Sequence, residues 1–132
     1  SWAPLHITSG GKLFLARMLP DEIRSYTERT GLKAGTQNAI QTLDRLLVTL
    51  ARARETGWAY DREEYESNVH CVAAPIFASG GRLIAAISLA AHRSNEFTPE
   101  CIAKLCGTAQ AISSAMGASI GERIKGQGYG DS

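Results

Sequence analysis

The sequence contains few cysteines, little net charge and no long apolar run, and each absence excludes a class of protein. Three widely spaced cysteines without a CxxC pair argue against a disulfide framework or a structural zinc site, and they favour a reducing cytoplasm. The net charge of +1 gives no electrostatic reason for direct binding to nucleic acid or to a membrane. No apolar run reaches the roughly 18 residues of a membrane-spanning helix, and nothing at the start resembles a signal peptide. The 132 residues, 44% of them hydrophobic, therefore suit one cytoplasmic domain.

Residues 69–91 form the most apolar stretch, and they predict a β-hairpin. Two runs of about ten apolar residues flank a glycine pair, a pattern typical of a tight hairpin turn. The turn at Gly80-Gly81 sets an expected register of four pairs: Ala78 with Leu83, Phe77 with Ile84, Ala73 with Ser88, and Cys71 with Ala90. Pro75 cannot donate to the ladder, so a bulge or an unpaired edge position is expected there.

Side chains alternate across a strand, so this register gives the hairpin two different faces. One face holds small residues with a thiol and a hydroxyl: Cys71, Ala73, Ser88 and Ala90. The other is bulky and aliphatic: Val72, Ala74, Ile76, Leu83, Ala85, Ile87 and Leu89. We expect helices to pack on the aliphatic face and the small-residue face to line a cavity.

The start of the chain offers a second candidate feature, a loop of small residues. Residues 5–8 alternate like a strand, a short helix is expected from Leu13, and Ser9, Gly10 and Gly11 lie between them. Backbone N–H groups at a helix start carry partial positive charge and can bind a carboxylate or phosphate. The segment is not a P-loop, because the GxxxxGK[ST] spacing is absent. A simple turn without a ligand is the alternative for the two glycines.

Capping residues predict the remaining elements. Helices are expected over residues 20–31 and 42–57, each ending at a glycine, and residues 58–61 alternate like a short strand. A last helix is expected from Thr98, which precedes a proline at the first helical position. Its apolar stripe is Ile102, Leu105, Ala109, Ile112, Met116 and Ile120. Helices mixed with antiparallel strands in this order predict an α+β domain.

Three segments in this order resemble a known family. They are LHITSGGKLFLARMLPDEI, GWAYDREEYESNVHCVAAPIF and LIAAISLAA, followed by a long terminal helix. They look like the effector-binding domain of the IclR family of bacterial transcriptional regulators. The resemblance implies a GAF-like fold, with an antiparallel sheet, flanking helices and the long C-terminal helix packed on the sheet. It also implies an N-terminal winged helix-turn-helix DNA-binding domain that is absent from this chain.

The resemblance further implies a ligand site on the concave side of the sheet. In the family, a glycine loop, an acid after the aromatic strand, a hairpin cysteine and two hydroxyl positions contact the ligand. Their counterparts here are Ser9, Gly10, Gly11, Asp61, Cys71, Ser88 and Ala90. Val69 and Ala73 complete the effector-binding set that we expect. The hydroxyl lost at Ala90 favours a larger or more apolar acid, such as an aromatic one, and Asn68 stands where glycine is usual.

Enzymatic and metal-binding interpretations are weaker. Cys71 would need a neighbouring base to act as a nucleophile, but the adjacent His70 is expected on the opposite face. His6, His70 and His92 with Asp61 match no standard zinc spacing, so neither a metal nor another cofactor is expected. The alternatives left open are a stand-alone GAF-like ligand-sensing module and, with less support, a thiol-dependent enzyme.

We therefore interpret residues 1–132 as one effector-binding and oligomerisation domain of a transcriptional regulator. Its core is expected over residues 4–121, and the small polar tail at residues 122–132 is expected to be disordered. The expected effector is a small organic acid, and the domain is not expected to be an enzyme. We expect self-association as a dimer or tetramer, DNA contact only through the missing N-terminal domain, and no contact with a membrane.

Overall fold

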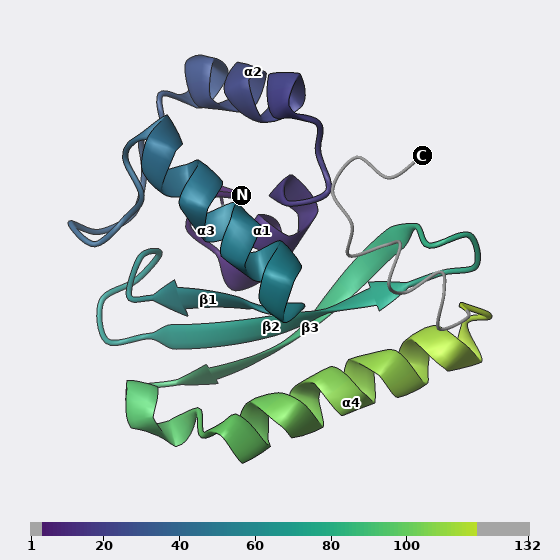
Figure 1. Cartoon of the computed structure of the whole chain (residues 1–132). Helices are drawn as coiled ribbons and strands as arrows, with labels where there is room; N and C mark the ends of the chain where they lie inside the picture. The colour runs from purple at the N-terminus through teal and green to yellow at the C-terminus, as the bar shows by residue number, and fades with distance from the viewer. Residues whose placement is uncertain (1–3, 119–132) are drawn as a thin grey trace.

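The sheet lies between two groups of helices, which gives the α+β architecture predicted from the sequence. The computed structural model describes residues 4–118. The three strands are antiparallel in the order β1-β2-β3. In Figure 1 the helices that precede the strands in sequence lie above the sheet, and the long C-terminal helix lies below it. The elements are α1 (Ser9–Leu15), α2 (Pro20–Thr30), α3 (Leu43–Thr56), β1 (Ala59–Arg62), β2 (His70–Phe77), β3 (Leu83–Ala91), η1 (Ser94–Glu96) and α4 (Pro99–Ala115).

The predicted capping residues begin and end the longer helices. The Thr42 hydroxyl accepts the Arg45 N–H at the start of α3, and Gly57 ends that helix with a left-handed φ of 82°. Thr98 caps α4 in the same way, with proline at the first helical position. Gly31 ends α2 with φ 64°. These caps satisfy backbone groups that would otherwise lack partners, which is why the boundaries were predictable.

The first turn of α1 differs from the sequence-based expectation in two respects. Residues 5–8 form a turn and a bend rather than a strand, and the helix begins at Ser9, so Ser9 to Gly11 are helical rather than a loop. The helix begins here because Thr8 caps it. The Thr8 hydroxyl accepts the Gly11 N–H, and the Thr8 backbone carbonyl accepts the Lys12 N–H. The glycines therefore belong to the helix.

The hairpin register agrees with the prediction over most of its length. Ala73 pairs with Ser88, and Cys71 pairs with Ala90. Near the turn the prediction was wrong, because Phe77 pairs with Leu83 instead of Ile84 across an irregularity between Ile76 and Phe77. A β-bulge shifts the register by one residue and reverses the side-chain direction. Leu83 consequently packs with the core beneath α1 to α3 rather than with the aliphatic face. The sequence predicted a bulge at Pro75, but Pro75 pairs with Ala86 and the irregularity begins one residue later, after Ile76.

Helices cover both faces of the sheet, whereas the sequence predicted a cavity on one of them. The core on the α4 side contains Val72, Ala74, Ile76, Leu105 and Ala109. The core on the opposite side joins the small-residue face to α1, α2 and α3 through Leu13, Leu15, Ile23, Leu46, Leu50 and Ala73, among others. In the α4 stripe, Met116 lies past the helix end and is 51% exposed, and Ile120 is outside the described residues.

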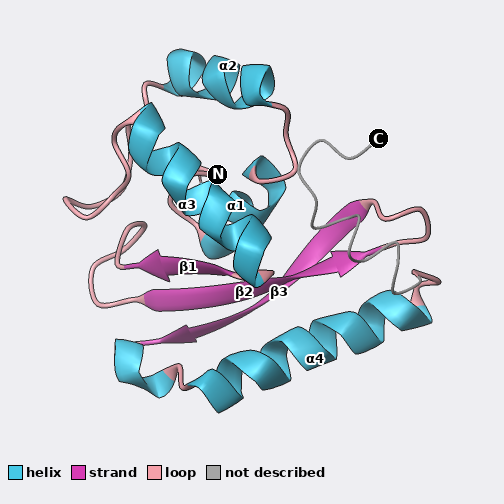
Figure 2. Ribbon diagram, in the orientation of Figure 1, coloured by secondary structure: helices cyan, strands magenta, loops and turns pink. Residues whose placement is uncertain are grey.

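Two loops meet at one end of the sheet. Figure 2 shows the α2–α3 loop and the β1–β2 loop on the same side of the molecule. Thr36 joins them, because its N–H donates to the Glu64 carbonyl at 2.8 Å and its hydroxyl donates to the Glu63 carbonyl. Asn68 in the second loop has φ 64°, a left-handed conformation that asparagine tolerates better than most residues. That conformation is the physical reason why glycine suits this position.

A buried ion pair ties α1 to β1 and to the loop that follows it. The Lys12 ammonium lies 2.6 Å from Glu64 Oε2, and both side chains are under 10% exposed. Lys12 also donates to the Tyr60 carbonyl at 2.5 Å, and Glu64 Oε2 accepts the Arg62 N–H at 3.1 Å. The two side chains therefore neutralise each other and also provide hydrogen-bond partners for two backbone groups of β1.

Replacement of Lys12 by methionine should destabilise the domain strongly. The variant keeps the apolar stem but leaves the Glu64 carboxylate buried without a counter-charge. We expect the free energy of unfolding in urea to fall by about 3–5 kcal/mol. The double variant Lys12→Met/Glu64→Leu should recover much of this loss, because it removes both buried charges, and exposed Arg24→Gln serves as the control. Equal stability of Lys12→Met and the parent protein would contradict a structural role for the pair.

Candidate functional site

The candidate site is the small-residue face of the sheet where α1 begins. Asp61, Cys71 and Ala90 form one row across the three strands, and Ala59, Ala73 and Ser88 form the next. A Cβ placed on Gly10 would lie 3.6 Å from the Ala86 Cβ, so the first turn of α1 rests on this face. The structure therefore brings the predicted thiol, hydroxyl, acid and glycine segment to one side of the sheet.

The face is closed at β1 and open at β3. Asp61 is 2% exposed and Ala73 is fully buried, whereas Cys71 is half-buried. Ser88 and Ala90 are exposed to solvent on β3. The Ser88 hydroxyl is thus accessible to a ligand, and the absence of a side chain beyond Cβ at Ala90 leaves space beside it.

Each residue of the first α1 turn has a different environment. Ser9 is buried, Gly10 is half-buried and Gly11 is buried. A Cβ on Gly11 would collide with the Leu5 backbone and the Thr8 hydroxyl, and the Gly11 N–H is already bonded to that hydroxyl. Gly11 is therefore a packing glycine, and its amide is committed to the cap. Gly10 has room for a side chain and is the position closest to the open face.

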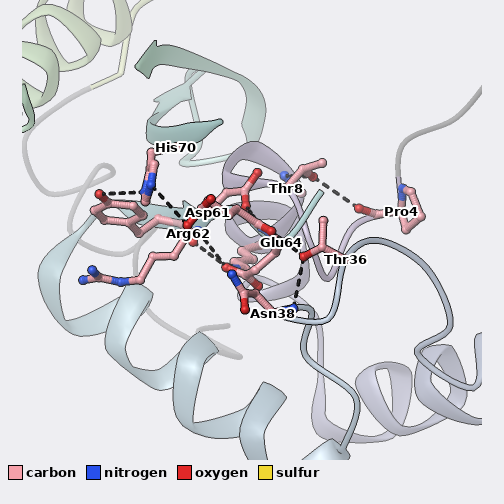
Figure 3. Close-up of polar contacts among 12 residues, drawn as sticks. Pro4, Thr8, Thr36, Asn38, Asp61, Arg62, Glu64 and His70 are labelled. Atoms are coloured by element: carbon pink, nitrogen blue, oxygen red, sulfur yellow. Dashed lines mark hydrogen bonds and ion pairs between the residues drawn. The ribbon is translucent and has the colours of Figure 1, made fainter. Parts of the chain in front are cut away.

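Asp61 is a buried carboxylate next to a second carboxylate, that of Glu64. Its Oδ1 accepts the Glu64 N–H at 2.7 Å, and Figure 3 shows Asp61 and Glu64 side by side with Thr36 next to them. Burial raises the pKa of Asp61, and the nearby Glu64 carboxylate raises it further, although the Glu64 and Tyr65 N–H groups and the Lys12 charge act in the opposite direction. The site thus contains an acid that holds its proton more tightly than an exposed aspartate.

Cys71 has no feature of an activated nucleophile. Burial raises the pKa of its thiol, and the adjacent Asp61 charge raises it further. His70 lies close to Glu63, at 3.6 Å, and to the Tyr60 hydroxyl, at 3.5 Å. His92 contacts the Asn68 carbonyl at 3.0 Å. Both histidines therefore interact with the β1–β2 loop or with β1 rather than with the thiol.

Val69 is the last residue of the β1–β2 loop, directly before β2. Its carbonyl accepts the Glu63 N–H at 3.2 Å, its N–H donates to the Glu66 carbonyl, and its side chain is half-buried.

Within residues 4–118, no three His, Cys, Asp or Glu side chains are grouped closely enough to hold a metal ion. No helix in the same range is both long and apolar enough to cross a bilayer.

The sequence analysis missed Lys12 and Glu64, the residues that hold the site together. A lysine at the start of the apolar run Leu13-Phe14-Leu15 and a glutamate close behind Asp61 are the only signals. Neither signal identifies the partner, because 52 residues separate the two side chains in sequence. The ion pair fixes the loop that follows Asp61 against the helix that carries Gly10.

Comparison with known proteins identifies the family. Residues 1–114 match the family model described as bacterial transcriptional regulator IclR C-terminal. The chain is 37% identical over 122 residues to the DNA-binding transcriptional repressor YiaJ of Escherichia coli (strain K12), covering 89% of this chain and 43% of YiaJ. It is 35% identical over 117 residues to the HTH-type transcriptional regulator KdgR of the same strain, covering 86% of this chain and 44% of KdgR. The chain spans less than half the length of these relatives.

Solved structures with the same fold agree. The crystal structure of the transcriptional regulator YaiJ superposes with a TM-score of 0.78 at 37% identity, covering 87% of this chain and 67% of that chain. A double mutant of the inducer-binding domain of the PobR transcription factor from Acinetobacter, in complex with 3-hydroxybenzoic acid, superposes with a TM-score of 0.75 at 28% identity. That match covers 84% of this chain and 66% of the PobR chain. The chain therefore belongs to the family of C-terminal domains of IclR-type bacterial transcriptional regulators.

Proposed function

We propose that the chain binds a small organic acid at the small-residue face and thereby controls DNA binding by a helix-turn-helix domain elsewhere in the protein. The observation that carries this proposal is the convergence of Asp61, Cys71, Ser88 and Gly10 at one partly open face. The names of YiaJ, a DNA-binding repressor, and KdgR, an HTH-type regulator, support the regulatory role. The proposed location is the cytoplasm, where such regulators meet DNA.

An acid with an apolar or aromatic body suits this face best. Ala90 offers a small apolar contact, and the Ser88 hydroxyl can donate to or accept from one polar group of the ligand. Ala73 is covered by the core beneath the helices and would contact a ligand only after α1 moves. The carboxylate would lie toward the start of α1, where the helix dipole is positive. A ligand hydroxyl would lie toward Asp61. The PobR domain, which carries 3-hydroxybenzoic acid, supports this ligand class.

Ligand binding would act through α1. Lys12 links that helix to Glu64, and Thr36 links the Glu64 loop to the segment before α3. A ligand that binds one arrangement of α1 more tightly than another shifts the population of the whole domain. In an assembled dimer or tetramer, which we also propose, this shift would change the spacing of the DNA-binding domains. Native mass spectrometry measures the assembly directly.

A thiol-dependent enzyme is the second candidate, and the surroundings of Cys71 disfavour it. Its thiol lies next to a carboxylate rather than a base, and its pKa is raised by burial and by that charge. A catalytic thiol requires the opposite shift. A regulatory domain in which Cys71 makes a packing contact with the ligand accounts for both features.

Substitution of Ser88 by leucine should remove effector binding without unfolding the domain. We expect 3-hydroxybenzoate, the first probe of a thermal-shift screen of carboxylic acids, to raise the melting temperature of the parent protein. Ser88→Leu and Gly10→Asp should reduce that shift strongly, through steric blocking and through charge repulsion respectively. Ser25→Leu on α2 and Gly107→Asp on α4, both exposed, are the matched controls. Unchanged binding in Ser88→Leu would exclude this face as the site.

The alkylation rate of Cys71 should be slow at neutral pH. In a Cys101→Ser/Cys106→Ser background, iodoacetamide should react with the folded protein more slowly than with the unfolded chain at pH about 7.5. Because the thiol pKa is raised, the rate should still increase beyond pH about 8.5, where an ordinary cysteine is half ionised. Asp61→Asn should accelerate the reaction by removing a nearby negative charge. A rate that reaches its plateau below pH about 7 would favour the enzyme instead.

Asp61→Asn should stabilise the domain at neutral pH. Asparagine can still accept the Glu64 N–H, but it avoids burying a charge. The pKa of Asp61 is higher in the folded than in the unfolded state, so the stability contributed by this group falls as pH rises through the folded-state pKa. The gain in stability of the Asp61→Asn variant, measured by urea unfolding, should therefore be largest near pH about 7 and vanish below pH about 4. A loss of stability at neutral pH would show that the carboxylate is structural.

A further inference from the structure

β3 forms a long edge of the sheet, on the side opposite β1 (Figure 2). Within residues 4–118 its strand partner is β2 alone, so the backbone groups on its other side have no strand to pair with. The nine residues Leu83–Ala91 span about 30 Å. None of them is buried, whereas β2 is buried over most of its length. The edge is therefore long enough to pair with a whole further strand.

The sequence of β3 has none of the features that protect an edge strand. Natural edges are very short or carry charged side chains or proline, because an open edge otherwise pairs with another strand. Leu83–Ala91 contains no charged residue and no proline, and it exposes Ile84 (36%) and Leu89 (42%). The other edge differs, since β1 has four residues and two of its backbone groups are bonded to Lys12 and Glu64. β3 thus has the composition of an interior strand.

The surfaces on both faces of β3 are also incomplete. On the α4 side, a groove of about 470 Å³ is lined by Ile87 and Leu89 of β3 and by residues of α4 that include Leu105. On the α1 side, Ser88 and Ala90 are exposed. A neighbouring strand would lie about 4.8 Å from β3, and its side chains would point alternately to the two faces. One added strand with apolar residues toward the α4 groove would therefore cover both surfaces.

Comparison with isolated domains of the relatives indicates the source of such a strand. The chain covers 44% of KdgR but 71% of the crystallised C-terminal domain of E. coli KdgR, which superposes with a TM-score of 0.72 at 27% identity. It covers 66% of the PobR inducer-binding domain. About a third of each of these domain chains therefore has no counterpart in the matched residues. Because a domain buries its apolar surface within itself, residues of this unmatched part are expected beside an open apolar edge.

We propose that the outer edge of β3 pairs with a further β-strand, supplied by the part of the regulator's effector-binding domain that lies outside these 132 residues. The strand extends the sheet, covers Ile84 and Leu89, and contributes apolar side chains to the α4 groove. It also closes the open side of the effector face beside Ser88, a consequence that rests on the proposed function. A second copy of the chain is the competing occupant of this edge, and dilution separates the two.

Amide hydrogen exchange tests this pairing without any effector, so its result is independent of the effector site. Every second backbone amide of an edge strand points outward. These amides of β3 should exchange at least about tenfold more slowly in the full-length regulator than in the 132-residue chain. The protection in the full-length regulator should persist on dilution to low micromolar concentration, because an intramolecular contact does not depend on concentration.

Two results of the exchange experiment would overturn the proposal. One is equal exchange of the β3 amides in the two proteins. The other is protection that depends on concentration, either lost from the full-length regulator on dilution or gained by the 132-residue chain together with a dimer in native mass spectrometry. That result would assign the edge to a second copy of the chain.

A charge placed on the edge provides an independent measurement. Leu89→Lys should lower the melting temperature of the full-length regulator by about 2–4 °C or more, because the added strand would desolvate the ammonium. In the 132-residue chain, where Leu89 is 42% exposed, the same change should have little effect. Val48→Lys on α3, at a side chain that is 65% exposed, is the matched control and should have little effect in both proteins. Equal melting shifts for the two variants in the full-length regulator would contradict the pairing.

Discussion

The ion pair between Lys12 and Glu64 is the contact on which the arrangement of the domain depends. An edge strand exposes backbone groups that invite pairing with another chain. Here the Tyr60 carbonyl and the Arg62 N–H of β1 are occupied by the two members of the pair. The same contact presses α1 against the sheet from a position 52 residues away in sequence. One buried pair thus protects an edge and positions a helix.

The position of α1 determines what the small-residue face can bind. Gly11 has no space for a side chain, so the helix start lies as close to the preceding turn and bend as the backbone permits. Gly10 rests on Ala86, and the residues nearby on this face are small. A side chain at Gly11 would collide with the Leu5 backbone and the Thr8 hydroxyl, and would lift α1 away from its contact with Glu64. The small residues that suggested a pocket are therefore also a packing requirement, and only the open part at β3 remains available to a ligand.

The sequence predicted those features that depend on neighbouring residues. Thr42 and Gly57 mark the start and the end of α3, because a capping residue acts within one helical turn. The pairing of Ala73 with Ser88 follows from the position of the glycine turn. The bulge at Phe77 was not predictable, because the alternation of apolar residues continues through it. The alternation of apolar and polar residues over residues 5–8 did not correspond to a strand, since the adjacent side chains of His6 and Ile7 are both fully buried. The ion pair was hidden by its long separation in sequence.

Asp61 on β1 and Glu64 in the loop that follows β1 connect the proposed effector face to the buried ion pair. The Glu64 N–H donates to Asp61 Oδ1 at 2.7 Å, and the Glu64 carboxylate lies 2.6 Å from the Lys12 ammonium. The Glu64 charge raises the pKa of Asp61, whereas the Lys12 charge lowers it. Because coupling is reciprocal, a ligand that binds next to Asp61 would also act on the pair that holds α1 against the sheet.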